Sequence, residues 1–489
     1  MGGMQGEMGM ELWAIVPELT LAGLILLLLP LGPFLPAGRK YLATWVALIG
    51  LLVVAVESIW MLTFATQPVF LDTYVVDPFA VYFKLFAVAS TAFVLLATQS
   101  HFRGRPHEGV VPALLLLACL GIMGLAASQD LALIALFIQL VTVSSYILVG
   151  IAKESRPAAE AAFKMFLFSA TVGAVMIYGM VLLFGLTGTL RLPELASKLA
   201  AEPVVTTLAA FLLVLAGFGF EVTLVPFHTW APDVYQGAPT PIAGFLSVGP
   251  KAAGLAVLLR TLLVAFPHNL GHWAELFAVL AAVTMTVGNL FALRQSSVKR
   301  LLAYSSIGQV GYILVGMAAA ERSRLAVPGM LLYLAVYLFM NLGAFLAVDA
   351  IERQLKSDEI EQLAGLGRRL PVPAAVLAIC LLALAGFPPF GSFVGKTYLF
   401  GAALSAGWTW LAIVMLLNVA ISLYYYVRVL APMYLRPSSQ EKPRQKEARG
   451  LRFALILLAL GTLISGVLPQ AWVALAIHAS SLLAAFVLH

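Results

Sequence analysis

The chain has 489 residues, of which 62% are hydrophobic and only 11% are charged. A soluble domain carries about 25% charged residues, so this composition excludes a water-soluble enzyme. The net charge of +6 does not indicate nucleic-acid binding, because Lys and Arg in the cytoplasmic loops of a membrane protein explain it. The two cysteines, Cys119 and Cys380, are too few to hold an iron–sulfur cluster.

Apolar runs follow one another along the whole chain, and each is long enough to cross a bilayer. They cover residues 12–30, 41–64, 76–98, 110–127, 129–151, 160–186, 204–225, 240–265, 273–293, 299–319, 325–350, 372–406, 409–434 and 451–468. Their length, without two-residue alternation, predicts an all-α polytopic membrane protein with about fourteen transmembrane helices. The first run has no cleavage site and is expected to be a retained helix. The stretch after Pro469 is predicted to be an interfacial tail.

Basic residues are distributed unevenly between alternate loops. One set of loops holds nineteen Lys and Arg residues, whereas the other set, with both termini, holds four. The first set is therefore predicted to be cytoplasmic, with both termini outside, in a plasma or inner membrane. Six further cations fall within the predicted helices, namely Lys84, Lys164, Lys251, Arg260, Lys396 and Arg428. Charge inside hydrocarbon is costly, so such residues are expected to mark ion paths.

A weak internal repeat links two proline-interrupted segments. Residues 144–150 read SSYILVG and residues 311–316 read GYILVG. Pro226 follows Tyr146 by 80 residues, and the pair Pro388 and Pro389 begins 76 residues after Tyr312. Proline-interrupted helices at matching positions indicate a transport site near the membrane midplane.

The lysines near these interruptions are candidates for proton transfer. Lys251 lies among small residues in the middle of its apolar run, and Lys396 follows the second proline break by seven residues. A buried lysine suits proton transfer, because burial disfavours its charged form and a nearby carboxylate favours it. The alternative for each is a lysine that reaches the membrane interface with its long side chain.

Two further ionisable residues flank the first break. Glu221 lies five residues before Pro226, and Lys251 on the next predicted helix could pair with it. His228 follows Pro226 by two residues and would suit a proton relay, although it could equally bind the broken backbone. The sequence predicts no metal site.

Three segments resemble a known family. Residues 217–241 read GFGFEVTLVPFHTWAPDVYQGAPTP, residues 303–316 read AYSSIGQVGYILVG, and residues 381–400 read LLALAGFPPFGSFVGKTYLF. They resemble the proton-translocating, antiporter-like membrane subunits of respiratory complex I. Residues 360–371 and 424–430 look most like the subunit N family of NADH-quinone oxidoreductase, called subunit 2 in mitochondria and chloroplasts. The resemblance covers roughly residues 110–435, and translation is expected to begin at Met1 or Met10.

The resemblance implies two inverted five-helix repeats, with the seventh and twelfth helices broken. The expected divisions are 1–109 for helices 1–3, 110–265 for helices 4–8, 266–435 for helices 9–13, and 436–489 for a cytoplasmic loop, helix 14 and the interfacial tail. No cofactor is expected in this chain. FMN, iron–sulfur clusters and quinone are expected in partner subunits, which drive protons through this one, and the expected neighbours are other membrane-arm subunits and the lipid bilayer.

Two residues match the family and two depart from it. Lys251 matches the central lysine of the eighth helix, and Lys396 matches the lysine of the twelfth. Gln139 stands where the family usually has glutamate, and Glu221 stands where it usually has lysine. In the family, the making and breaking of this Glu–Lys pair is thought to switch the central lysine. Because a glutamine cannot titrate, that switch cannot operate unchanged here.

Two hypotheses explain the altered pair. In the first, Glu221 has become the charge partner of Lys251; in the second, this half of the protein has degenerated, and the subunit is a structural or partially conducting member of its complex. We favour the first, because a buried carboxylate is costly and drift would more readily leave a neutral residue. For the whole chain the leading function is a redox-driven proton-translocating subunit, and the alternatives are a cation/proton antiporter subunit and a non-pumping scaffold. The electron donor, whether NADH, ferredoxin, F420 or hydrogen, stays open at this point.

Overall fold

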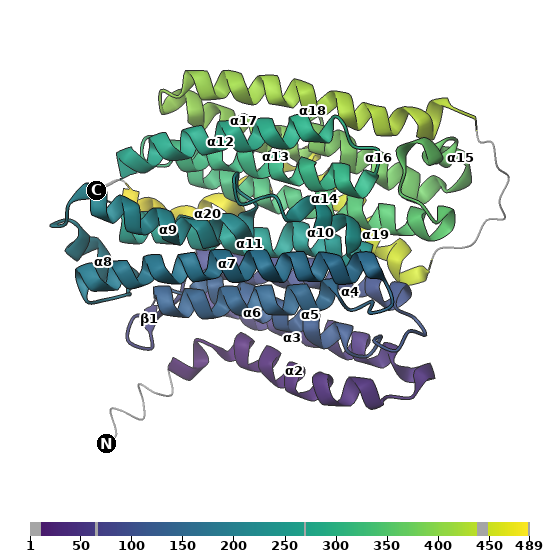
Figure 1. Cartoon of the computed structure of the whole chain (residues 1–489), viewed down its shortest axis with the longest axis horizontal. Coiled ribbons are helices and arrows are strands. Elements are labelled where there is room, and N and C mark those ends of the chain that lie inside the picture. Colours follow the sequence, from purple (N-terminus) through teal and green to yellow (C-terminus); the bar gives the residue numbers. More distant parts are fainter. Residues whose placement is uncertain (1–10, 64–66, 268–269, 438–447, 488–489) are drawn as a thin grey trace.

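The computed structural model describes residues 11–63, 67–267, 270–437 and 448–487, and these are almost entirely helical (Figure 1). The helices are α2 (Val16–Phe34), α3 (Tyr41–Trp60), α4 (Pro78–His101), α5 (Val111–Ala127), α6 (Leu131–Val149), α7 (Arg156–Thr187), α8 (Leu192–Leu199), α9 (Val204–Val222), α10 (Ala231–Gly237), α11 (Thr240–Ala265), α12 (Leu270–Ala292), α13 (Val298–Ala319), α14 (Ala326–Leu355), α15 (Leu366–Arg369), α16 (Pro371–Ala385), α17 (Gly391–Ser405), α18 (Thr409–Leu435), α19 (Arg449–Val467) and α20 (Pro469–Val487). Short 3-10 turns lie at η1 (Ala37–Arg39), η2 (Met61–Thr63) and η4 (Ile360–Leu363).

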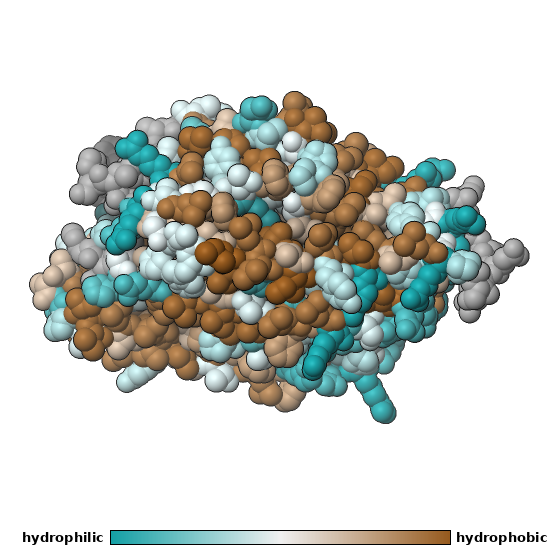
Figure 2. Space-filling view, turned by 90° about the horizontal axis from the view of Figure 1, so that it is seen from above, coloured by the Kyte–Doolittle hydropathy of each residue, from teal (hydrophilic) through white to brown (hydrophobic). Residues whose placement is uncertain are grey.

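The predicted class of polytopic helical membrane protein is confirmed. Within the described residues, twelve helices are long and apolar enough to cross a membrane, and α5 and α16 are shorter apolar helices. Each predicted apolar run coincides with one of these helices or with a pair separated by a break. Figure 2 shows hydrophobic side chains over much of one long face. The total of fourteen spans and the inverted repeats stay predictions.

Polar caps and glycines set several helix ends. The side chain of Asp77 begins α4 by accepting a hydrogen bond from the backbone N of Ala80 at 2.6 Å. Asp130 begins α6 in the same way, through the backbone N of Ala132 at 2.8 Å. Gly386 ends α16 with a φ of +88°, a left-handed conformation that favours glycine. The chain can therefore reverse or break at these points without leaving helix ends unsatisfied.

Three helices form the centre of the bundle. In α11 the apolar window is wholly buried, and in α13 and α14 it is 94% buried, against 33% in the peripheral helices α2, α3 and α7. Helix α14 packs against α11 and α13, and also against α16, α17 and α19. Polar side chains on α11 and α13 are thus enclosed by other helices.

Some elements were not predicted from the sequence. Strands β1 (Gln67–Val69) and β2 (Tyr74–Val76) form an antiparallel hairpin between α3 and α4, with Pro68 opposite Val75. Helix α8 lies in the connection between α7 and α9. The stretch after Pro469, predicted as an interfacial tail, forms α20, which packs against α4, α11 and α14. Met10 lies outside the described residues.

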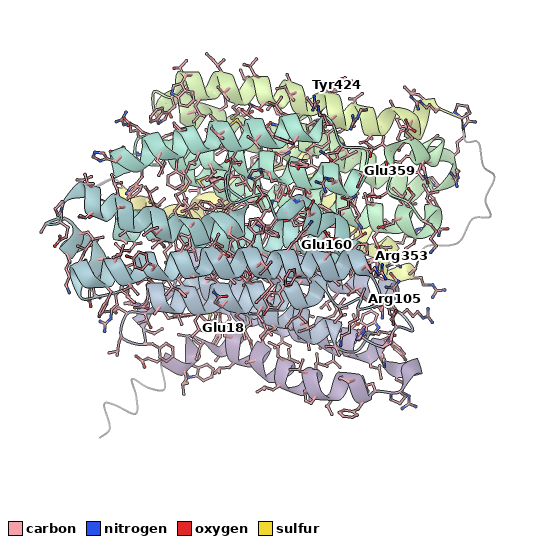
Figure 3. All side chains as sticks on the ribbon, in the orientation of Figure 1. Glu18, Arg105, Glu160, Arg353, Glu359 and Tyr424 are labelled. Atoms are coloured by element: carbon pink, nitrogen blue, oxygen red, sulfur yellow. The ribbon has the colours of Figure 1, made fainter. Side chains whose placement is uncertain are left out.

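The two ends of the described chain lie at the same end of the bundle. Helix α2 begins and α20 ends toward the left of Figure 1. Arg105 and Arg353 lie at the opposite end, as their labels in Figure 3 show. The side of the membrane on which the termini lie stays a prediction.

Candidate functional site

Both proline-containing segments interrupt a helix. Pro226 lies in the non-helical stretch between α9 and α10, and Pro388 and Pro389 lie between α16 and α17. Such a break frees backbone carbonyls inside the bundle, and these can accept hydrogen bonds from buried donors. The ionisable residues predicted from the sequence lie on these broken helices or on α11, which follows the first of them.

Lys251 is buried in the middle of α11, where its side chain is only 1% exposed. Its ammonium group donates a hydrogen bond to the hydroxyl of Ser306 on α13 at 2.7 Å. The same nitrogen lies 5.6 Å from the centre of the Tyr235 ring. This lysine therefore does not reach the membrane interface, and the alternative of an interfacial lysine is wrong in this structure.

Glu221 is also buried, near the end of α9, but it faces a different helix. One carboxyl oxygen is 2.6 Å from the hydroxyl of Thr142 on α6. No ion pair within 4.0 Å joins Glu221 to Lys251, although Gly254, one turn after Lys251, packs directly against the Cβ of Glu221. The predicted direct pair between the two side chains is therefore not present, because Glu221 turns toward α6 and Lys251 turns toward α13.

The hydroxyl of Thr142 lies between two oxygen atoms. It is 2.8 Å from the backbone oxygen of Ile138 and 2.6 Å from Glu221, yet it carries only one hydrogen. Thr142 can donate to a charged Glu221, and if it donates to Ile138 instead, a protonated Glu221 can donate to Thr142. The arrangement accommodates both forms of the carboxyl group without moving the backbone.

The other two residues near the first break are less enclosed. Gln139 is half-buried on α6, one turn before Thr142, and its amide faces Gly173 on α7. His228 is half-buried within the break, and its Nδ1 has no hydrogen-bond partner among the described residues. Within the described residues, no hydrogen bond or ion pair joins His228 to Lys251 or Gln139 to Glu221.

Lys396 lies at the second break, on the first turns of α17, and is 6% exposed. Its ammonium donates to the backbone oxygens of Leu384 at 2.9 Å and Ala385 at 3.2 Å. These are carbonyls at the last turn of α16, where the helix dipole favours a positive charge. The nitrogen also lies 4.7 Å from the centre of the Tyr312 ring.

A series of polar side chains on α13 lies between the two lysines. Gln309 donates to the backbone oxygen of Leu384 at 3.1 Å, so it shares this acceptor with Lys396. Gln309 also donates to the hydroxyl of Tyr426 on α18 at 3.1 Å, and Tyr426 bonds to Ser305. Ser305 is the neighbour of Ser306, which binds Lys251. We call Ser305, Ser306, Gln309 and Tyr426 the α13 polar series.

A side branch leaves the α13 polar series near Lys396. The hydroxyl of Tyr312 accepts a hydrogen bond from Asn289 on α12 at 3.0 Å. Asn289 also donates to Asn418 on α18 at 3.1 Å and accepts from Tyr425 at 2.9 Å. The series and its branch were missed from the sequence, because their members are neutral residues inside apolar runs.

Two of the cations within predicted helices form buried ion pairs. Lys84 is 2.9 Å from Glu18 on α2. Arg260 binds Asp77 through two nitrogens at 2.8 and 3.0 Å, and it donates to the backbone oxygen of Ala126 at 3.0 Å. Since both charges of each pair are held locally, these residues join α4 to α2 and α11 rather than extend the α13 polar series.

The other two cations lie nearer the surface. Lys164 on α7 pairs with Asp233 on α10 at 2.8 Å, and its side chain is 39% exposed. Arg428 on α18 donates to the backbone oxygens of Leu293 at 2.6 Å and Gln295, just beyond the end of α12. The prediction that every cation within a helix marks an ion path is therefore too broad.

The arrangement of these buried ionisable and polar groups defines a class of protein. Buried ionisable groups lie near two helix breaks and on α11, and hydroxyl, amide and phenol groups lie between Lys251 and Lys396 in the centre of a polytopic membrane bundle. Groups of this kind in membrane proteins are typical of ion and proton transport. No group of three or more metal-binding side chains occurs within the described part of the chain.

Comparison with known proteins identifies the family. Residues 128–422 match the family described as NADH:quinone oxidoreductase/Mrp antiporter, transmembrane region, and the chain belongs to this family. It is 39% identical to NADH-quinone oxidoreductase subunit N of Trichlorobacter lovleyi, over 93% of this chain and 94% of the relative. It is 34% identical to F(420)H(2) dehydrogenase subunit N of Methanosarcina mazei, over 97% of this chain and 100% of the relative.

A solved structure supports the same assignment. The chain is similar to a chain of respiratory complex I from Thermus thermophilus with bound aureothin, with a TM-score of 0.79 and 31% identity. The match covers 94% of this chain and 99% of the other. The resemblance predicted from the sequence motifs is therefore confirmed over nearly the whole length.

Proposed function

We propose that this chain is a proton-translocating membrane-arm subunit of a redox-driven complex of the NADH-quinone oxidoreductase type. The observation that carries the proposal is the α13 polar series, in which Ser306 binds buried Lys251 and Gln309 shares the carbonyl of Leu384 with buried Lys396. Both lysines are held by neutral groups, so each can gain or lose a proton without breaking an ion pair. Waters between the polar groups would complete the transfer path.

Redox chemistry belongs to other subunits in this proposal. FMN, iron–sulfur clusters and quinone would be held by partners, and their turnover would change the electrostatics around Lys251. Relatives named for NADH and for F(420)H(2) share this type of membrane subunit. The electron donor is therefore a property of the partner subunits and not of this chain.

The proposed orientation follows the basic residues. We place the end of the bundle that carries Arg105 and Arg353 on the cytoplasmic side of the plasma or inner membrane, and both termini on the other side. The neighbours in the membrane would be other antiporter-like and small helical subunits. The exposed apolar surfaces of α2, α3 and α7 are available for lipid or for these partners.

Glu221 is proposed as a second proton-binding group that acts beside Lys251 and is not paired with it. Its hydrogen bond to Thr142 suits both protonation forms, and its Cβ packs against α11 one turn from Lys251. A non-pumping scaffold would have no need to keep a carboxyl group buried at this cost. The antiporter alternative shares the same lysines, but the relatives reported above are named as subunits of dehydrogenase and oxidoreductase complexes.

The direct test is the substitution Lys251→Met in the complete complex, reconstituted in vesicles. Proton uptake per electron transferred is expected to fall, because the buried site can no longer bind a proton. Lys198→Met is the matched control, since Lys198 is exposed on the short helix α8, in the connection between α7 and α9. If Lys251→Met left the proton-to-electron ratio unchanged in a fully assembled complex, the proposed path through Lys251 would be wrong.

A further inference from the structure

A polar cavity opens at the end of the bundle opposite the described termini. It has a volume of about 880 Å³ and lies between the start of α3, the end of α4, the last turns of α14 and the start of α19. Sites for small organic ligands usually enclose roughly 300–1,000 Å³, so the cavity can hold a group of that size. It is separate from the buried lysines and plays no part in the proton path proposed above.

Three guanidinium groups line this cavity, those of Arg103, Arg353 and Arg449. Arg353 bonds to Asp349 at 2.7 Å and to Ser100 at 2.9 Å, yet its Nε is buried without a hydrogen-bond partner among the described residues. The side chains of Arg103 and Arg449 are exposed and form no ion pair with any residue that the structure describes. The cavity therefore holds hydrogen-bond donors that the protein itself leaves free.

The charge balance favours a singly charged anion. Asp349 balances Arg353, which leaves Arg103 and Arg449 as two unpaired positive charges. Among the described residues, the one acidic side chain that lines the cavity is Glu108, which is 5% exposed and accepts a hydrogen bond from the backbone N of Gly104 at 2.8 Å. The described lining side chains therefore carry one net positive charge, which matches the single negative charge of a phosphodiester. Guanidinium groups are the usual partners of phosphate oxygens.

Apolar surface lies beside the mouth of the cavity. Tyr41 lines the cavity and is 44% exposed, and Trp45, one turn further along α3, is 48% exposed. Exposed Tyr and Trp at the end of a membrane helix are typical of the headgroup level of a bilayer. Below them Ile49 and Leu52 continue the exposed face of α3 into the membrane. An acyl chain can follow this face while its phosphate remains in the cavity.

We propose that this cavity binds the phosphate of an anionic phospholipid from the leaflet that it faces, with the acyl chains lying along α3. Arg103 and Arg449 bind the phosphate oxygens, and Arg353, which is held in place by Asp349 and Ser100, lines the cavity beside them. The loop between α4 and α5 is held beside the loop between α2 and α3 by the hydrogen bond of Lys40 to the backbone oxygen of Pro106, at 3.0 Å. A lipid bound there would tie α3, α4, α14 and α19 together at this end of the bundle.

The test uses the whole complex in vesicles that contain equal amounts of phosphatidylglycerol and phosphatidylcholine. In one sample phosphatidylglycerol carries a photoreactive acyl chain, and in a parallel sample phosphatidylcholine carries it. Crosslinks to peptides of α3 and α19 in this chain are counted for each lipid. The unaltered protein is expected to favour phosphatidylglycerol, and the double substitution Arg103→Gln and Arg449→Gln is expected to lower that preference about tenfold, which corresponds to about 1.4 kcal/mol. The control is Arg294→Gln with Arg368→Gln, which removes two exposed arginines that do not line the cavity.

Each alternative occupant gives a different result. Equal crosslinking of phosphatidylcholine and phosphatidylglycerol to the unaltered chain would overturn the proposal. Loss of the phosphatidylglycerol signal on addition of millimolar inorganic phosphate would identify a soluble anion as the ligand, and a crosslink to a neighbouring subunit in place of this chain would show a protein-covered surface. Copurification of the variant chain with the complex confirms that it is folded, so that reduced crosslinking reports binding.

Discussion

Replacing Gln309 by leucine is expected to interrupt proton transfer between the two lysines. Gln309 is the member of the α13 polar series that bonds both to Tyr426 and to the carbonyl shared with Lys396. Leucine has a similar size but can neither donate nor accept a hydrogen bond. The path would then contain an apolar side chain between the hydroxyl of Tyr426 and Lys396.

The substitution also has a cost in stability, and its size follows from the lost bonds. Tyr333 donates its hydroxyl to the amide oxygen of Gln309, and this is its one hydrogen bond within the described chain. An unpaired buried donor costs about 1–3 kcal/mol. The two donor bonds of Gln309 add roughly 0.6 kcal/mol each, the average for hydrogen bonds in a membrane bundle. Gln309→Leu is therefore expected to destabilise the chain by about 2–4 kcal/mol.

A second substitution separates the functional effect from the structural one. Gln309→Leu combined with Tyr333→Phe removes the unpaired hydroxyl, so the cost in stability is expected to fall to about 1 kcal/mol. The interruption of the polar series remains. Proton pumping is measured by the quenching of a pH-sensitive dye in vesicles that contain the assembled complex, together with the rate of electron transfer. The control is Gln295→Leu, which makes the same change at the surface end of α12.

The double variant distinguishes a role of Gln309 in proton transfer from a role in stability. A barrier raised by only 1.4 kcal/mol slows a step about tenfold, so pumping by the double variant is expected to fall at least tenfold while the chain assembles normally. Pumping at the rate of the unaltered complex would show that protons do not pass Gln309. Recovery of pumping in the double variant alone would show that Gln309 serves stability and not transfer.

Two further substitutions test the neighbouring groups. Glu221→Gln keeps the size of the side chain and its contact with Thr142 but removes its ability to titrate. Proton pumping in vesicles is expected to fall without loss of assembly. An unchanged pumping rate would favour the scaffold alternative for the half of the protein that contains Glu221. Arg260→Met leaves Asp77 buried and unpaired, which typically costs about 3–5 kcal/mol. When the complex is heated, the Arg260→Met chain is expected to be lost from it to a large extent. Arg322 forms a largely exposed pair with Glu321 at 3.8 Å, so Arg322→Met is expected to reduce stability by under about 1 kcal/mol. Similar heat sensitivity of the two arginine variants would contradict the second prediction.

The fold was predictable from the sequence because hydrophobicity alone determines which segments enter a membrane. Each apolar run corresponds to a helix or to a pair of helices separated by a break, and Pro226 and Pro388 lie at helix breaks. The β1–β2 hairpin was missed, since its strands have three residues each and lie between two long helices. The packing of α20 against α14 was also missed, because an apolar segment of 19 residues has no pattern that distinguishes a packed helix from an interfacial one.

The site was predictable only in its charged members. Lys251 and Lys396 stand out because a lysine in an apolar run is rare and costly. Ser306 and Gln309 do not stand out, because neutral polar residues are common on helices that pack in membranes. Thr142 could have been suspected, since it lies one turn after Gln139, a residue that the sequence already singled out. Nothing in the sequence could show that Glu221 would turn to Thr142 and away from Lys251.

The separation of Glu221 from Lys251 has a mechanistic consequence. In a direct ion pair, each group holds the other in its charged form, and a proton can move only when the pair opens. Here each group has its own neutral hydrogen-bond partner, Thr142 for one and Ser306 for the other. A proton that passes from Glu221 to Lys251 therefore needs a third group or a water between them. His228 lies in the break that follows α9, and its Nδ1 lacks a partner among the described residues, so its role in that step stays a prediction.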